Sequence, residues 1–193
     1  MGGPSRRGTQ VPRDHRSDRR LLEGVRLEGG TVAQSPQPRM TADAGMVTHT
    51  TTVKVRWGDT DPAGIVFYPR FYEWYDLGTE SMFEALGQPW PEMFPREAIV
   101  GLPIVESGST FMAPIRYGDV VSVRSTVAWV KEKTFRMEHE VTIGTTVCAR
   151  GFEIRAWVAR PADAGTSPRA TPIPEHISRL LKARGRSDAL DRS

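Results

Sequence analysis

The stretch Trp57-Gly58-Asp59-Thr60-Asp61-Pro62-Ala63-Gly64-Ile65-Val66-Phe67-Tyr68-Pro69 separates two segments of opposite periodicity and decides the fold. Before it, residues 48–57 alternate between polar and apolar side chains, which predicts a strand. After it, apolar residues recur every three or four positions up to Leu86, which predicts a helix of about 17 residues. Gly87 suits the left-handed conformation that ends many helices. The stretch is therefore a strand-to-helix turn.

The segments that follow the helix read as strands. They are residues 99–112, 120–130, 134–143 and 147–158. No helix alternates with them, so a parallel doubly wound sheet is excluded and an α+β fold with an antiparallel sheet is predicted. A helix this apolar is expected against the concave face of the sheet. The exposed edges of such a sheet favour pairing with another copy of the chain.

Composition divides the chain into three parts. Residues 1–46 lack aromatic side chains and carry a net charge of +3, and they are predicted to be a disordered N-terminal extension. An RNA-binding arm is the functional alternative for this segment, because arginines bind phosphates. Residues 47–174 form the expected folded domain. Residues 175–193 form the C-terminal tail, with a short helix near 174–183 before it becomes disordered.

Charge and cysteine content exclude several classes of protein. The net charge is +3, but residues 47–174 carry −2, so the domain is not built to bind nucleic acid. The single cysteine, Cys148, allows neither an internal disulfide nor a cysteine-based zinc site, and it is expected to be buried. No apolar run reaches the ~20 residues of a membrane span. No secretory signal is recognised, so a cytoplasmic location is expected.

Two carboxylates stand in the turn that leads into the helix. The start of a helix exposes backbone N–H groups that can stabilise a carbonyl oxygen as it becomes negative, and Gly64 would let a substrate approach the backbone. A carboxylate beside such a site could attack a carbonyl carbon or activate water. Acyl chemistry is therefore predicted. The structural alternative is that Asp59 and Asp61 only cap turns; Asp59 suits that role better, and spacing alone leaves Asp61 open.

The block Trp57–Asp76, WGDTDPAGIVFYPRFYEWYD, closely resembles the signature of 4-hydroxybenzoyl-CoA thioesterases with a hotdog fold. It is similar to the branch whose catalytic residue is an Asp in the pattern D-x-D-P-A-G-I-V. The resemblance continues at Ile99–Val105, at Tyr117–Val120 and at Lys131–Phe135. It covers residues 50–160 and neither tail.

This resemblance implies a long central helix wrapped by a five-stranded antiparallel sheet, in a homodimer or homotetramer with the active site between protomers. Asp61 matches the catalytic carboxylate, acting as nucleophile or as general base. Tyr68 matches the residue whose backbone N–H polarises the thioester carbonyl. Lys131 and Lys133 fall where the family places basic residues near the nucleotide of coenzyme A, with Glu132 between them. No metal and no redox cofactor is implied, since coenzyme A belongs to the substrate.

The resemblance implies an acyl-CoA thioesterase. Pro69 stands where thioesterases for short aliphatic acyl groups carry a His, which favours an aromatic, 4-hydroxybenzoyl- or benzoyl-type substrate. The alternatives are a thioesterase for short-chain aliphatic acyl-CoA or acyl-carrier protein, and a non-catalytic acyl-CoA-binding module. A hotdog dehydratase needs a His beside an acidic residue, and the motif contains none. His139, on an alternating strand, is expected to be packed or at the surface rather than catalytic.

Overall fold

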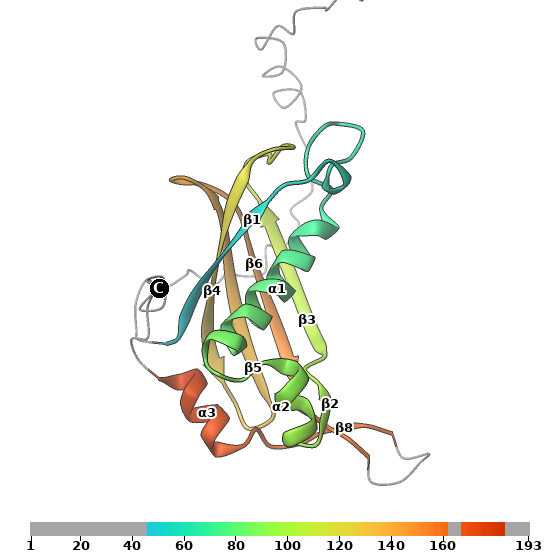
Figure 1. Cartoon of the computed structure of the whole chain (residues 1–193), viewed down its shortest axis with the longest axis vertical. Helices are drawn as coiled ribbons and strands as arrows, with labels where there is room; N and C mark the ends of the chain where they lie inside the picture. The colour runs from blue at the N-terminus through green and yellow to red at the C-terminus, as the bar shows by residue number, and fades with distance from the viewer. Residues whose placement is uncertain (1–45, 162–166, 184–193) are drawn as a thin grey trace, which may run out of the picture. The chain divides into compact units, whose positions relative to one another are not determined.

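A computed structural model describes residues 46–161 and 167–183, and its centre is a five-stranded antiparallel sheet (Figure 1). The strand order is β1-β4-β5-β6-β3. The bounds of these strands are β1 Thr48–Lys54, β3 Ile104–Phe111, β4 Val120–Val130, β5 Thr134–Ile143 and β6 Thr146–Ala156. β1 and β3 are the edges, as expected of the predicted α+β fold. The segment predicted as a disordered extension lies, apart from Met46, outside the described residues, as does the tail beyond residue 183.

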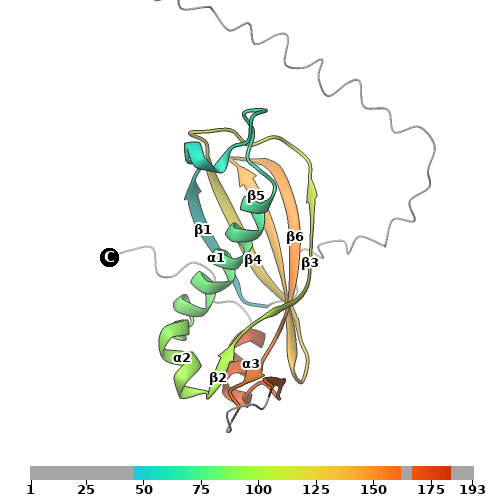
Figure 2. The ribbon, with the colours of Figure 1, turned by 90° about the vertical axis from the view of Figure 1, so that its right-hand side faces the viewer.

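The long helix α1, Pro69–Ala85, lies against one face of this sheet (Figure 2). Its length of 17 residues matches the prediction. Its sheet-facing stripe is buried and comprises Phe71, Trp74, Tyr75, Gly78, Thr79, Met82 and Phe83. Gly78 allows the helix to approach the sheet closely, because a Cβ there would lie 2.3 Å from the Ser125 hydroxyl. Gly87 has a φ of 71° and ends the helix in the left-handed conformation.

The single strand expected over residues 99–112 is two strands in the structure, and this expectation was wrong. β2, Ile99–Gly101, pairs with β7, Val158–Ala159, which also pairs with β8, Arg169–Ala170, in a second, three-stranded sheet. The break falls at Pro103, which has no N–H to donate to a ladder.

The helix α2, Trp90–Arg96, was not expected from the sequence. Pro89 and Pro91 stand on either side of its first residue, Trp90. Proline is favoured in the first turn of a helix, however, and here Pro89 is the N-cap. Met93 buries this short helix against the core.

The short helix expected near residues 174–183 is α3, Glu175–Lys182. Its Ile177 and Leu181 are buried in the same apolar cluster as Met82 and Phe83 of α1. Among the described residues, no helix combines the length and apolar character needed to cross a membrane.

Polar side chains interrupt the core between α1 and the sheet. His139 on β5 and Glu153 on β6 are both fully buried. The His139 Nδ1 lies 2.9 Å from the Ser125 hydroxyl, and the Thr79 hydroxyl donates to Glu153 over 3.2 Å. Arg155 is also buried and donates to Glu153 over 2.7 Å. His139 is therefore a packed core residue, one of the two places expected for it.

Candidate active site

The turn between β1 and α1 is held by backbone hydrogen bonds, and its Val66 is buried in an apolar cluster. The Asp61 N–H donates to the Ile65 carbonyl over 2.9 Å, and the Phe67 N–H donates to the Asp59 carbonyl over 2.8 Å. The Val66 N–H donates to the Ile115 carbonyl over 2.8 Å and ties the turn to the segment before β4. These bonds fix the positions of the two carboxylates relative to the helix start.

Asp59 serves the turn. Its Oδ2 accepts from the Arg56 N–H over 2.7 Å, and its Oδ1 lies 3.5 Å from the Arg70 Nε. Both oxygens are thereby engaged in local structure. This arrangement agrees with the structural role favoured for Asp59 from the sequence.

Asp61 keeps one oxygen available. Its Oδ1 accepts from the Ala63 N–H over 2.8 Å, which closes a tight turn around the carboxylate. Within the described residues, no hydrogen bond or ion pair engages Oδ2. The side chain is half-buried, so it can meet a substrate from solvent while its orientation is held.

The Tyr68 amide is the free donor at the start of α1. The N–H groups of Phe67, Arg70 and Phe71 each donate to a backbone carbonyl, and Pro69 has no N–H. The Tyr68 N–H, by contrast, has no acceptor among the residues that the structure describes. It stands at the positive end of the helix dipole, where an oxygen that gains negative charge is stabilised. The turn therefore offers one unused donor and, seven residues before it in the chain, one unused carboxylate oxygen.

Gly64 is needed for its backbone conformation. Its φ is 75°, and its N–H donates to the Asp61 carbonyl over 2.9 Å. A Cβ at this position would meet nothing within 4 Å of the same chain, so the space in front of the turn is open. A side chain here would strain the turn and project into that space.

Lys131 and Lys133 are not brought near Asp61 within one chain. They lie in the hairpin between β4 and β5, at the end of the sheet opposite the Asp61 turn (Figure 1). β4 has 11 residues, which corresponds to about 35 Å along the strand. The Lys131 ammonium instead lies 4.6 Å from the centre of the Trp129 ring.

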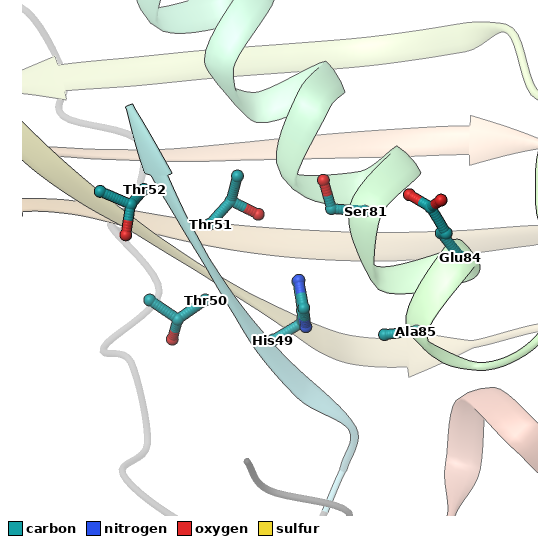
Figure 3. A pocket seen from close by; sticks show the side chains of 7 residues that line it. All are labelled: His49, Thr50, Thr51, Thr52, Ser81, Glu84 and Ala85. Atoms are coloured by element: carbon teal, nitrogen blue, oxygen red, sulfur yellow. The ribbon is translucent and has the colours of Figure 1, made fainter. Parts of the chain in front are cut away.

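Two open cavities lie elsewhere on the chain. One, of about 480 Å³, is a groove between β1 and α1 lined by six polar residues and one alanine (Figure 3): His49, Thr50, Thr51, Thr52, Ser81, Glu84 and Ala85. The other, of about 450 Å³, is mostly apolar and is lined by Asp76, Trp90, Phe94, Val100, Gly101, Leu102, Pro103, Ile104 and Arg155. Asp61 and Tyr68 line neither cavity.

Asp76 and Arg155 form an ion pair in the wall of the apolar cavity. This ion pair was not predicted from the sequence. The Arg155 Nη2 lies 2.5 Å from the Asp76 Oδ1 and 2.7 Å from the Glu153 Oε2. In the sequence, Asp76 is the last residue of the block 57–76 that resembles the family signature, whereas Glu153 and Arg155 lie far along the chain. Their contact with Asp76 therefore could not be inferred from spacing.

The electrostatics of the buried cluster are set by burial and by mutual contact. Burial opposes ionisation of Glu153, but contacts with His139 and Arg155 outweigh it and hold the Glu153 pKa below its ordinary value. Burial lowers the pKa of His139, which keeps the imidazole neutral. Burial likewise raises the pKa of Tyr75 to about 12, against the effect of its Ser109 partner. No three His, Cys, Asp or Glu side chains in the described segments are grouped to hold a metal ion.

Comparison with known proteins identifies the family. The model of the thioesterase-like superfamily matches residues 55–181. The 4-hydroxybenzoyl-CoA thioesterase of Pseudomonas sp. (strain CBS-3) is 30% identical over 127 residues, which are 63% of this chain and 88% of that protein. A 1,4-dihydroxy-2-naphthoyl-CoA hydrolase of Synechococcus sp. (strain WH7803) is 27% identical, over 68% of this chain and 87% of its own length.

Solved structures agree with this relationship. The Pseudomonas sp. strain CBS-3 thioesterase superposes with a TM-score of 0.63 at 29% identity, covering 71% of this chain and 99% of that one. A gentisyl-coenzyme A thioesterase superposes with a TM-score of 0.59 at 34% identity, covering 69% of this chain and 98% of its own. The predicted resemblance and the hotdog fold are confirmed. The chain belongs to the thioesterase-like superfamily with a hotdog fold, and it is a thioester hydrolase.

Proposed function

We propose that the protein hydrolyses an aromatic acyl-CoA thioester to the carboxylate and free coenzyme A. The observation that carries the proposal is the pairing of an unused donor with an unused carboxylate oxygen. The Tyr68 N–H stands free at the start of α1, and the Asp61 Oδ2 stands free in the turn that precedes it. Hydrolysis of a thioester needs both groups, one for the carbonyl oxygen and one for the carbonyl carbon.

The chemistry follows from these two groups. The thioester carbonyl accepts a hydrogen bond from the Tyr68 N–H, so negative charge on that oxygen is stabilised as the carbon becomes tetrahedral. Asp61 then acts in one of two ways. As a general base it removes a proton from water as the water attacks the carbonyl; as a nucleophile it forms an anhydride that water cleaves. In both routes the C–S bond breaks, coenzyme A leaves as the thiolate and takes up a proton, and the carboxylate is released.

A second copy of the chain completes the proposed site. β3 is a sheet edge, and its Ile104, Val105 and Phe111 side chains are exposed. If two β3 edges pair antiparallel about a two-fold axis, the Ile104 end of each strand lies opposite the Phe111 end of the other. The Phe111 ring packs 4.9 Å from Phe71 in the first turns of α1. Such pairing brings the apolar cavity beside Ile104 of one copy toward the Tyr68 amide of the other.

This arrangement supports an aromatic acyl group. The cavity that would face the site carries the Trp90 and Phe94 rings, which stack with centroids 5.6 Å apart. Aromatic walls suit a flat aromatic acyl group. The related proteins named above act on 4-hydroxybenzoyl-CoA, 1,4-dihydroxy-2-naphthoyl-CoA and gentisyl-CoA, all of which are aromatic. Pro69 also favours an aromatic substrate, because thioesterases for short aliphatic acyl groups carry a His at this position.

The same pairing would carry the hairpin at residues 131–133 of one copy to the Asp61 end of the other. We therefore keep Lys131 and Lys133 as proposed contacts of coenzyme A that act across the dimer rather than within one chain. Their charge suits phosphate groups. The backbone at Gly64 remains the proposed point of closest approach for the thioester.

A panel of acyl-CoA substrates tests the proposal. We expect kcat/KM for benzoyl-CoA or 4-hydroxybenzoyl-CoA to exceed that for butyryl-CoA and hexanoyl-CoA by at least ~10-fold, which is about 1.4 kcal/mol of transition-state binding. Equal or reversed ratios would remove the aromatic assignment and leave a thioesterase for aliphatic substrates. Binding of every member without hydrolysis would make the protein an acyl-CoA-binding module instead.

A further inference from the structure

Arg155 is the only buried arginine in the described part of the chain, with 3% of its side chain exposed. It stands near the end of β6, opposite Ile104, where β3 begins. A few residues further on, Val158 belongs to the second sheet. A guanidinium is always charged, and a buried charge is costly unless partners surround it. The partners of Arg155 therefore show what this side chain holds in place.

The guanidinium of Arg155 contacts several walls of the apolar cavity. Its Nη1 donates to the Leu102 carbonyl over 3.2 Å, and its Nη2 donates to the Asp76 Oδ1 over 2.5 Å. The guanidinium carbon lies 5.6 Å from the centre of the Trp90 ring. These three partners line the cavity, and so does Ile104, which is opposite Arg155 on β3. One side chain therefore connects α1, α2, β3 and the segment between β2 and β3.

Glu153 holds the same guanidinium from within the core. Arg155 donates to the Glu153 Oε2 through Nε over 3.0 Å and through Nη2 over 2.7 Å. Glu153 is fully buried, and its Oε2 also accepts from the Thr79 hydroxyl over 3.2 Å. The bonds to Glu153 and to the cavity walls together fix the plane of the guanidinium. A lysine carries one compact ammonium on a flexible stem and could not make all of these contacts together.

The walls that Arg155 joins are short or irregular. α2 has seven residues, and a helix this short is not stable in isolation. Leu102 and Pro103 belong to neither sheet, although the Ala156 N–H donates to the Pro103 carbonyl over 3.0 Å. Walls of this kind keep a fixed separation where side chains join them. Arg155 is the side chain that reaches each of the walls around this cavity of about 450 Å³.

We propose that Arg155 is a positioning residue that sets the acyl specificity of the enzyme. This inference rests on the proposed function, in which the apolar cavity holds the acyl group. By joining the cavity walls, Arg155 keeps a flat aromatic acyl group in one orientation, with its carbonyl at the Tyr68 amide and Asp61. Arg155 itself does not touch the reacting atoms. Loosened walls would still admit a short aliphatic chain, but an aromatic acyl group would reach the reactive geometry less often.

Two variants test this role. Arg155→Lys keeps a charge beside Glu153, and the double variant of Arg155→Met with Glu153→Gln replaces the buried ion pair by neutral side chains, so neither leaves an unpaired charge in the core. In both, kcat for benzoyl-CoA or 4-hydroxybenzoyl-CoA should fall by ~10-fold, whereas kcat for butyryl-CoA should stay unchanged. The matched control is Arg150→Met, on the same strand, which removes a surface ion pair with Glu140 and should change neither value.

A specific effect on the acyl group separates this role from general support of the fold. An unchanged ratio of aromatic to aliphatic kcat in cooperatively folded variants would show that Arg155 does not shape the cavity. An equal fall for both substrates, or loss of cooperative unfolding in both variants, would show that it supports the fold alone. Calorimetry should give the same affinity for free coenzyme A in wild type and variants, because Arg155 acts on the acyl group. Each contrary result overturns the inference.

Failure of the proposed function gives a different pattern. If the wild-type protein hydrolyses aliphatic acyl-CoA at least as well as aromatic acyl-CoA, the aromatic assignment fails. Arg155→Lys should then still alter the order of preference within the panel, and an unaltered order would overturn the inference. If the wild-type protein hydrolyses no member, calorimetry of benzoyl-CoA and butyryl-CoA binding replaces the assay. Arg155→Lys should then weaken the binding of benzoyl-CoA alone, and equal changes for the two ligands would overturn the inference.

Discussion

His139 and Glu153 bring two ionisable side chains into the interior between α1 and the sheet. The His139 Nε2 lies 3.6 Å from the Glu153 Oε2, and the imidazole stacks on the Tyr75 ring at 4.8 Å between centroids. Ser125 from β4 and Arg155 from β6 complete the surroundings. Burial lowers the pKa of the imidazole, so the folded protein holds it neutral. Protonation must then favour the unfolded chain.

The pH dependence of unfolding follows with a definite sign. A histidine whose pKa is lowered on folding stabilises the protein fully above its unfolded pKa of about 6.5 and loses that contribution as the pH falls below it. We expect the free energy of unfolding to drop between pH 7.5 and 5.5, by up to about 1.4 kcal/mol from this residue. His139→Asn cannot ionise there and should show a shallower slope in urea titrations. A steeper slope in the variant would reverse the assignment.

Protonation of Glu153 also lowers the free energy of unfolding, but at a lower pH than protonation of His139. Its pKa is held below the ordinary range despite burial, so its contribution is present above about pH 4.3 and is lost on further acidification. Glu138 on the same strand as His139 is only partly buried and pairs with Arg136 at 3.3 Å. The acid branch of the unfolding curve is therefore expected to begin with His139 and to steepen with Glu153.

The roles of residues in the strand-to-helix turn could be predicted from the sequence, because these residues are neighbours along the chain. Asp59 and Asp61 were assigned to a turn before a helix, and the structure shows that turn with Asp59 fully engaged. Which oxygen and which amide remain free depends on backbone geometry, which spacing does not reveal. The contact of Trp57 with Tyr117 joins positions 60 residues apart and had no local signal.

At the scale of elements, α3 shows how a short polar helix becomes part of the core. Its eight residues place Ile177 and Leu181 on one side, one turn apart, and both are buried against the main apolar cluster. Arg179, on the other side, pairs with Glu175 in solvent. The helix therefore depends on two apolar anchors rather than on its charges.

Leu181→Ala should consequently destabilise the protein by about 2–4 kcal/mol, because a fully buried leucine leaves a cavity when truncated. Arg179→Ala removes only an exposed ion pair and should cost less than about 0.5 kcal/mol. Thermal and urea unfolding of the two variants measure this difference. Similar, small losses in both would mean that α3 is not anchored to the core.

Two strands could be located accurately, although residues 120–130 alternate less cleanly in the sequence than residues 134–143. The expected segments 120–130 and 134–143 coincide with β4 and β5, because both strands bury every second side chain. The segment 99–112 was misassigned as one strand, since the chain passes from one sheet to the other at Pro103. α2 was missed because seven residues with two internal prolines carry too little periodicity.

On the scale of the whole molecule, the exposed β3 edge is the surface best suited to pairing with a second copy of the chain. Val105 is 60% exposed and Ile104 is 43% exposed, on a strand whose outer side has no ladder partner in the described sheet. Unpaired edges with apolar side chains promote pairing between copies. The opposite edge, β1, carries threonines over most of its length.

A lysine introduced on one edge at a time tests whether copies of the chain pair through β3 or through β1. Val105→Lys should weaken the proposed dimer and lower kcat/KM together, since a second copy completes the proposed site. Thr50→Lys, at a position on β1 that is also exposed, should leave both unchanged. Light scattering after size-exclusion chromatography reports the oligomer, and the thioesterase assay reports the site. A Val105→Lys variant that becomes monomeric and stays fully active would show that one chain suffices.

Asp61 is proposed to attack the thioester or to activate water, and the kcat of Asp61→Asn measures that role. Asparagine keeps an oxygen for the Ala63 N–H, so the turn and substrate binding should persist while the base is lost. We expect kcat to fall by ~10²–10⁴, whereas Asp59→Asn should cost far less, because Asp59 serves the turn. An Asp61→Asn variant that keeps more than about a tenth of the wild-type kcat, or an Asp59→Asn variant that abolishes it, would show that Asp61 does not carry the reaction.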